Sequence, residues 1–364
     1  MNAPLSFLDL KSVSPGGKTR NFGLDIVRAF SIILVLIAHR FPHQYEIGLV
    51  GVQVFFILSG FLIGQILLND FKNSGNYQTV FKFWKRRWYR TLPLYYLVLI
   101  LKMLFVGNPY GWKIIIYVFF MQANFIGIDF LPVSWSLVVE EWFYIFLPLA
   151  TLIFFSKGIN PRKFLFYLFG LILFFISVRF FWNYLHKGII IYQFDCLLIG
   201  VLLSLIKLYF QNIYRLLNSV ILFIIGFIGV IVLTFVLGDL TNIPLFSPFY
   251  RVIWYFLISI CIAITIPYIE LSKFFNNTVK AIRPIYLFFT WTSILTYSFY
   301  LIHASIFLIH FNVSEYLNVI MHAIILYVAA FFIYIFYEHP MMSLRENFSV
   351  AHYKNSVKTA FAKI

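Results

Sequence analysis

The sequence predicts an all-α, polytopic membrane protein whose helices pack as a transmembrane bundle. The chain has 364 residues, of which 62% are hydrophobic and only 11% are charged, and its mean hydropathy is +0.89. A soluble domain typically carries about 25% charged residues. Apolar runs of roughly 20 residues, enough to cross a bilayer as a helix, recur from one end of the chain to the other.

Eleven apolar windows are candidates for membrane spans. They cover residues 24–41, 49–68, 91–107, 111–127, 136–155, 163–182, 189–208, 216–237, 250–269, 290–310 and 316–337. The first 20 residues are polar and carry no cleavable signal sequence, so we expect the first window to remain as a span.

Loop charge decides which windows cross, because Lys and Arg accumulate in cytoplasmic loops. If residues 111–127 crossed, every later basic loop would lie outside. We therefore predict about ten spans, with both termini cytoplasmic and 111–127 as a re-entrant or externally packed helix. The predicted organisation is a cytoplasmic tail over 1–21, a membrane domain over 22–340 and a second cytoplasmic tail over 341–364.

The net charge of +15 is explained by these cytoplasmic loops, and we expect no nucleic-acid partner. The two cysteines, Cys196 and Cys261, lie in apolar segments, which excludes a disulfide framework or a paired-cysteine metal site. No histidine spacing suggests a metal site either, so none is predicted.

Arg28 and His39 lie eleven residues apart in the first span. Eleven residues make about three helical turns, so both side chains share one face, about 16 Å apart along the axis. Ionisable residues within a span are costly and indicate function. The topology places Arg28 near the cytoplasmic end and His39 near the outer end of this helix.

Two motifs allow both a structural and a functional interpretation. In the second span, Gly60 and Gly64 form a GxxxG pair that favours close packing, for which we expect the first span as partner. The following basic segment contains Arg86, Arg87 and Arg90 among aromatic residues. It is typical of an interfacial helix on anionic lipid, but its guanidinium groups also suit a bound phosphate.

Acidic residues of later spans complete the candidate site. Glu140 and Tyr144 share one face of the span over 136–155, and Glu141 points about 100° away. Glu140 is expected at the depth of His39, where it could orient that ring as a general base. A buried structural pair is the alternative. Asp195 lies at the outer start of a later span and His303 lies inside another, and a packing role is as plausible for His303 as a catalytic one.

The ordered motifs of this chain resemble those of the acyltransferase-3 family of integral-membrane enzymes that modify cell-surface polysaccharides. The resemblance extends over 22–340 and rests on R-x10-H, GVQVFFILSGFLI, RRWYRTLPLYY, WSLVVEEWFY, QFDCLLIG, YSFYLIH and YEHP. It implies an O-acyltransferase, most often an acetyltransferase, in the bacterial cytoplasmic (inner) membrane. The donor would be acetyl-CoA and the acceptor a glycan hydroxyl, as in lipopolysaccharide O-antigen or exopolysaccharide, lipid-linked or not.

The resemblance also implies roles for individual residues. His39 would be the catalytic histidine with Arg28 as its partner, Arg86, Arg87 and Arg90 would lie near the donor's phosphates, and Glu140 would be the acidic site residue. Candidates on the acceptor side are Glu141, Tyr144, Asp195 and His303. Some members carry an additional esterase-like domain, and with 24 residues after Pro340 we expect none here.

The sequence leaves two other classes of function open. A proton-coupled transporter or flippase could use the same intramembrane charges, although no inverted repeat is evident. A catalytically inactive scaffold is disfavoured because Arg28, His39 and Glu140 are all present. Within the acyltransferase interpretation, direct transfer and an acyl-histidine intermediate both remain open.

Overall fold

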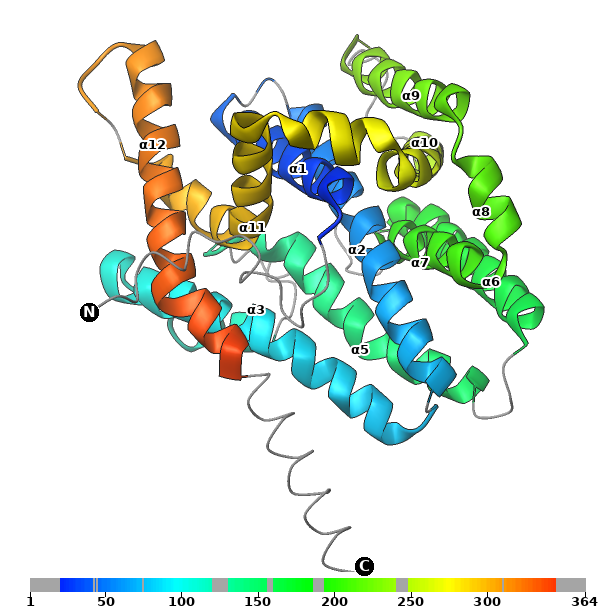
Figure 1. Cartoon of the computed structure of the whole chain (residues 1–364). Helices are drawn as coiled ribbons and strands as arrows, with labels where there is room; N and C mark the ends of the chain where they lie inside the picture. Colours follow the sequence, from blue (N-terminus) through cyan, green and yellow to red (C-terminus); the bar gives the residue numbers. More distant parts are fainter. Residues whose placement is uncertain are drawn as a thin grey trace, which may run out of the picture.

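The structure is a computed structural model, and only helices occur among the residues it describes. The described residues are 20–41, 43, 45–73, 75–119, 130–155, 160–185, 193–239, 248–309 and 311–344. Predictions for the two tails, including the basic residues before Arg20 and after Leu344, lie outside these ranges. The predicted all-α bundle is confirmed (Figure 1).

Twelve α-helices and four short 3₁₀ or π segments follow one another along the described chain. The α-helices are α1 (Phe22–Arg40), α2 (Tyr45–Asn73), α3 (Tyr77–Val106), α4 (Ile115–Val118), α5 (Trp135–Phe155), α6 (Pro161–Leu185), α7 (Phe194–Tyr209), α8 (Gln211–Leu217), α9 (Val220–Asp239), α10 (Pro248–Leu271), α11 (Arg283–Ile306) and α12 (Glu315–Ile333). The short segments are η3 (Gly111–Ile114), η5 (Pro132–Ser134), η8 (Phe274–Val279) and η9 (Tyr334–Glu338), the last continuing α12 as a π-helix.

Eight of these helices are long and apolar enough to cross a membrane. The helices α7 and α8 form a ninth candidate, bent by 118° at a short break, and α9 is a shorter apolar helix. This makes the protein a multi-pass membrane protein. The count of ten spans and the cytoplasmic position of both termini remain predictions.

The segment predicted as a helix over 111–127 is only partly described. It begins with η3 and the single turn of α4, so its described part is helical through Val118. Gly107 and Gly111 adopt positive φ values of 82° and 56°, which breaks the helix after α3. The Tyr117 hydroxyl accepts hydrogen bonds from the amides of Phe130 and Leu131, at 3.0 and 3.1 Å. Tyr117 thus joins the described chain on the two sides of residues 120–129, and the expectation that 111–127 does not cross stays a prediction.

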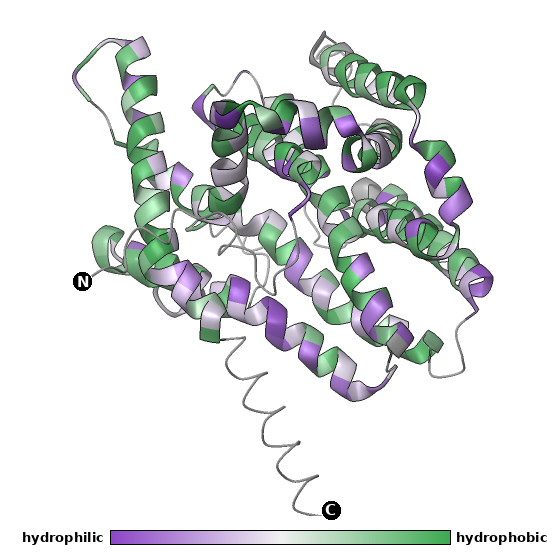
Figure 2. Cartoon of the chain, in the orientation of Figure 1, coloured by the Kyte–Doolittle hydropathy of each residue, from purple (hydrophilic) through white to green (hydrophobic). Residues whose placement is uncertain are grey.

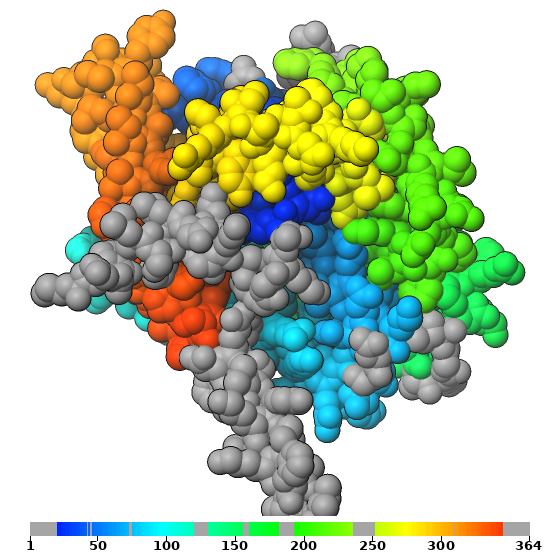
Figure 3. All heavy atoms as spheres, in the orientation of Figure 1, coloured from blue at the N-terminus to red at the C-terminus, as the bar shows by residue number. Residues whose placement is uncertain are grey.

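The first helix lies at the centre of the bundle. Its residues Ala29, Ile32 and Val35 are buried, and in the face shown in Figure 3 only a small area of α1 is visible between α10 and α2. Its N-terminus is capped by the Asn21 side chain and by Asn276 of η8, which accepts from the Gly23 amide at 3.1 Å. These caps fix the first turn of α1, which carries Asp25.

The second helix packs between α1 and α7 through glycines on its two faces. A methyl group on Gly51 would lie 2.7 Å from the Ser31 carbonyl oxygen of α1, whereas one on Gly60 would overlap the Leu197 carbonyl of α7. The predicted packing of the Gly60–Gly64 pair against the first span is therefore wrong. Gly51 and Gly60 are nine residues apart, which is about half a turn out of phase, so they face opposite neighbours.

Hydrophilic residues are distributed unevenly over the bundle. Figure 2 shows them alternating with apolar residues along the first half of α3, while α9 is almost uniformly hydrophobic. The basic stretch of α3 faces α2 and α5, and this brings its arginines to the site described next.

Candidate active site

Arg28 is held near the N-terminal end of α1 by one acidic and one hydroxyl side chain. Its Nη1 lies 3.4 Å from Oδ1 of Asp25 and donates to Ser293 Oγ of α11 at 3.0 Å. Asp25 also pairs with Arg20 through contacts of 2.5 and 3.0 Å. Two guanidinium groups therefore share one carboxylate, and this leaves an excess of positive charge.

Two of the three predicted donor-binding arginines of α3 lie with Arg28. The guanidinium groups of Arg28, Arg87 and Arg90 interact electrostatically with one another and with Arg20. We call these four arginines the arginine cluster. Like charges gathered where water is scarce are unfavourable unless an anion joins them, so this arrangement suits a phosphate or another multivalent anion.

Arg86 lies apart from the cluster. Its Nη1 donates to Asp70 Oδ2 of α2 at 3.2 Å, and 40% of its side chain is exposed. Arg86 and Arg87 are consecutive on one helix and therefore point about 100° apart, so only one of them can face the cluster. The structure thus does not bring Arg86 together with the other predicted donor residues.

Glu140 and Tyr144 of α5 face the arginine cluster. The Tyr144 ring lies 4.3 Å beneath the Arg87 guanidinium carbon, and its hydroxyl is 2.5 Å from Ser59 Oγ of α2. The carboxylate of Glu140 interacts with the same Ser59 and Tyr144 hydroxyls and with Arg87. Glu141 is buried one position further on, beside Thr91 of α3.

No hydrogen bond or ion pair of the described residues joins Glu140 to His39, contrary to the predicted contact. The reason is the position of α5. This helix begins beside the C-terminal half of α11, where Ser136 meets Tyr300, and by Glu140 it has already reached the level of Arg87. Hydropathy predicts where a helix begins and ends in the sequence, but it does not predict how far that helix is shifted along its axis relative to its neighbours.

The neighbour of His39 is His303, in the last turn of α11. The two ring centroids are 4.7 Å apart and the rings meet edge to face at 78°. His39 is exposed and its Nδ1 lies 2.9 Å from the Val35 carbonyl oxygen, whereas His303 is completely buried. With Nδ1 as the donor, Nε2 of a neutral His39 carries the lone pair that a general base needs.

Tyr300 lies between the histidine pair and the arginine cluster. Its ring centroid is 5.9 Å from that of His303, and its hydroxyl donates to the Val133 carbonyl and is 2.5 Å from Ser136 Oγ. The same tyrosine interacts electrostatically with Glu140. Tyr300 thus contacts His303 and interacts with Glu140, which itself interacts with Arg87.

Asp195 does not join this site. It is fully buried at the start of α7 and forms an ion pair with Arg179 of α6, which is also buried. Gln193 and Gln53 lie beside this pair and are joined to each other by a hydrogen bond of 2.9 Å. Of the four predicted acceptor-side residues, only His303 lies with His39.

Asp195→Asn is expected to destabilise the protein because it leaves the buried Arg179 charge without its counterion. Removing one partner of a buried pair costs about 3–5 kcal/mol. Thermal unfolding of the detergent-solubilised protein should show a lower midpoint. The matched control is Glu315→Gln, which breaks the Arg40–Glu315 pair where the glutamate side chain is 65% exposed. Such exposed pairs contribute about 1 kcal/mol or less, and equal midpoints for the two variants would contradict the structural role of Asp195.

Two buried charged residues near these groups were not singled out by the sequence. Glu338, within the YEHP motif, accepts a 2.8 Å hydrogen bond from Ser298 and interacts electrostatically with Arg90. It ends the π-helix η9, an irregularity that frequently marks a functional site. Arg179 lies in an otherwise apolar helix, and this alone could have identified it as a partner for an acidic residue.

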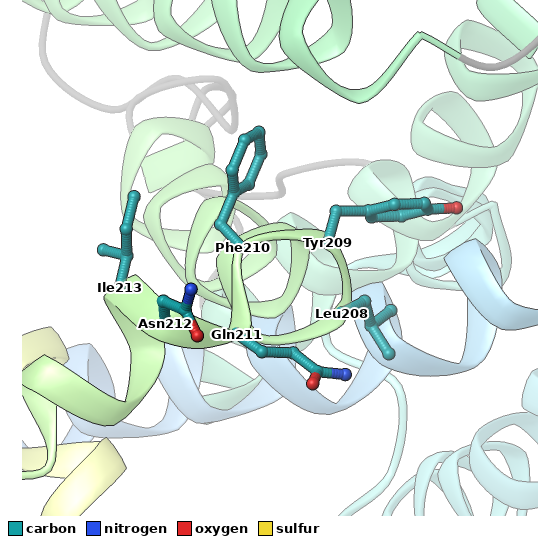
Figure 4. A pocket seen from close by; sticks show the side chains of 6 residues that line it. All are labelled: Leu208, Tyr209, Phe210, Gln211, Asn212 and Ile213. Carbon is teal, nitrogen blue, oxygen red and sulfur yellow. The ribbon is translucent and has the colours of Figure 1, made fainter.

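The pocket drawn in Figure 4 lies elsewhere, at the bend between α7 and α8, and is lined by residues 208–213. None of the candidate site residues contributes to it. Within the described ranges, no group of three or more His, Cys, Asp or Glu side chains could hold a metal ion.

The fold and the site thus define a multi-pass helical membrane protein with a partly buried arginine cluster and an exposed histidine. Comparison with known families then places the chain. The acyltransferase-3 family, described as an acyltransferase domain, matches residues 21–338, so the chain belongs to this family.

Curated relatives are similar to a part of the chain. O-acetyltransferase OatA of Staphylococcus aureus is 29% identical over 162 residues, which are 39% of this chain and 26% of that protein. Peptidoglycan O-acetyltransferase OatA of Listeria monocytogenes is 29% identical over 167 residues, 41% of this chain and 27% of its own length. The matched region is thus about a quarter of these relatives. No solved structure matches the chain.

Proposed function

We propose that the protein is a membrane O-acetyltransferase that moves an acetyl group from cytoplasmic acetyl-CoA to a hydroxyl of a cell-envelope glycan. The observation that carries this proposal is that one helix, α1, bears a residue of the arginine cluster at one end and the exposed His39 at the other. Eleven residues separate Arg28 from His39, about 16 Å along the axis, which a long, extended donor can bridge.

In this proposal the arginine cluster binds the phosphate groups of coenzyme A. Arg28, Arg87 and Arg90 supply guanidinium groups, and Tyr144 holds Arg87 in place from beneath. Planar guanidinium groups bind phosphate through paired hydrogen bonds, and a low dielectric strengthens each contact. The predicted phosphate role is kept for Arg87 and Arg90, while Arg86 is assigned to its contact with Asp70.

The transfer step takes place at His39. Its Nε2 removes the proton from the acceptor hydroxyl as the oxygen attacks the thioester carbonyl carbon. The carbon–sulfur bond then breaks, and the departing thiolate takes up the proton from His39, so the products are an acetyl ester and free coenzyme A. An acyl-histidine intermediate remains an alternative in which Nε2 attacks the carbonyl first.

Localisation and acceptor belong to the same proposal. The protein would lie in the bacterial cytoplasmic membrane with both termini inside, surrounded by lipid and facing its acceptor on the outer side. The acceptor would be a surface glycan, free or lipid-linked. One relative's name supplies peptidoglycan as one such glycan, and the sequence resemblance suggests lipopolysaccharide O-antigen or exopolysaccharide.

Mass spectrometry of envelope glycans from cells with and without this chain tests the proposal. We expect an additional mass of one acetyl group on one glycan fraction, removable by mild base, only in cells that carry the chain. Peptidoglycan, lipopolysaccharide and exopolysaccharide fractions are measured separately, so the result also identifies the acceptor. Identical glycan masses in all fractions would contradict the proposal and favour a transporter.

A further inference from the structure

We propose that His303 is a positioning residue that stabilises the protonated form of His39 during transfer. This inference deepens the proposed acetyltransferase function and rests on it. It assigns to His303 the part that the sequence had suggested for Glu140.

The hydrogen bonds of His303 determine where its lone pair lies. Nδ1 is within 3.1 Å of the Phe299 carbonyl oxygen and 2.8 Å of the Tyr300 carbonyl oxygen, one turn earlier on α11. Because carbonyl oxygens only accept, Nδ1 carries the proton, and Nε2 of the neutral ring carries the lone pair. The ring therefore has one fixed tautomer and one fixed orientation.

The Nε2 atom of His303 is buried and has no hydrogen-bond partner. A buried polar atom without a partner costs free energy, and such atoms are rare in folded proteins. The side chain is enclosed by aromatic rings, with Phe307 at 5.8 Å and Tyr300 at 5.9 Å between centroids. The titratable ring facing it from α1 is His39, at 4.7 Å.

The two histidines differ in access, and this separates their roles. His39 is exposed and can reach a substrate, whereas His303 is completely buried behind it. When His39 takes the proton of the acceptor hydroxyl, its ring becomes positively charged. The unused lone pair of the fixed neighbouring ring then stabilises that charge, because nearby charged and polar groups interact strongly where water is excluded.

Other charged groups near His39 are already engaged. Arg40 follows His39 directly and pairs with Glu315 at the start of α12. Glu140 lies with Arg87, Ser59 and Tyr144. Among the described residues, His303 is thus the ring in direct contact with His39 that can respond to its protonation.

Two substitutions at position 303 separate the role of the Nε2 lone pair from that of the Nδ1 hydrogen bond to the backbone. Asn offers an amide NH₂ where Nδ1 stands and so keeps the bond to the backbone, but it lacks an acceptor at the Nε2 position. Gln is longer and can place its amide oxygen near the Nε2 position. A purely structural role would require only the hydrogen bond to the backbone, whereas the proposed role requires a hydrogen-bond acceptor at the Nε2 position.

The measurement uses inside-out membrane vesicles of the expressing bacterium, which contain the natural acceptor, and acetyl-CoA labelled in its acetyl group. We expect His303→Asn to lower kcat by about tenfold to a hundredfold, with the KM for acetyl-CoA and the thermal midpoint unchanged. His303→Gln should recover a measurable part of the lost rate. Wild-type turnover by His303→Asn would overturn the proposal, as would equal losses for both variants accompanied by a lower thermal midpoint.

The wild-type protein and His39→Ala, measured in the same vesicles, separate this inference from the proposed function. If the wild-type protein transfers no label, the acetyltransferase proposal itself fails. If it does transfer label and His39→Ala does not, the function stands and the result for position 303 tests the inference alone.

Discussion

His39→Ala is expected to abolish acetyl transfer while the protein still inserts and folds. General-base catalysis contributes about 10²–10⁴-fold to a rate, so the variant should lose at least two orders of magnitude in kcat. His39 is exposed, and among the described residues its hydrogen-bond partner is the Val35 carbonyl oxygen of its own helix, so its removal should cost little stability. The measurement is the rate of ester formation from labelled acetyl-CoA.

His43 provides the matched control for this variant. It is an exposed histidine four residues further along the chain and lies outside α1. His43→Ala should therefore transfer acetyl at the wild-type rate. If His39→Ala retained normal transfer, or if both variants lost it equally, the assignment of His39 as the catalytic base would be wrong.

Arg28→Ala is expected to weaken use of the acetyl donor far more than it alters the chemical step. Hydrogen bonds to charged groups are each worth about 1.5–3 kcal/mol, so the KM for acetyl-CoA should rise by about tenfold to a hundredfold. Asp25 keeps Arg20 and Ser293 as partners in this variant, so no buried carboxylate is left alone. Steady-state kinetics with varied acetyl-CoA give the result.

Arg86→Ala separates a specific phosphate site from the general attraction of positive charge. Arg86 lies one residue before Arg87 but contacts Asp70 on the surface of α2. The control variant also removes one positive charge, from α3 rather than α1, and should leave the KM for acetyl-CoA within about twofold of wild type, as is usual for exposed charges. Equal increases in the KM for acetyl-CoA in Arg28→Ala and Arg86→Ala would show that the geometry of the arginine cluster does not determine donor binding.

Most of the bundle could be predicted from local information. Apolar length located the helices, whereas the expectation from the basic loops that 111–127 does not cross stays a prediction, because residues 120–129 lie outside the described ranges. Arg28 and His39 both contact α11, through Ser293 and His303, as their shared helical phase predicts. Each of these features depends on residues that are close together in the sequence, and for this reason the sequence alone predicts it.

Contacts between helices were harder to predict because they depend on relative shifts along the bundle. Nothing in the local sequence indicated that Gly60 faces α7 or that α5 begins deep enough to place Glu140 beside Arg87. For the same reason, the ring beside His39 is His303 and not the carboxylate of Glu140. Phase predicts which residues share a face, but the packing partner of that face is a property of the whole fold.

Transfer of labelled acetyl from acetyl-CoA to envelope glycan in reconstituted vesicles tests the central claim most directly. The purified protein is incorporated into vesicles with extracted envelope lipids and glycan, and acetyl-CoA is supplied on the side of the arginine cluster. We predict one base-labile acetyl ester on glycan for each coenzyme A released, and no transfer by His39→Ala. Movement of label across the membrane without ester formation would contradict an acetyltransferase and indicate a transporter.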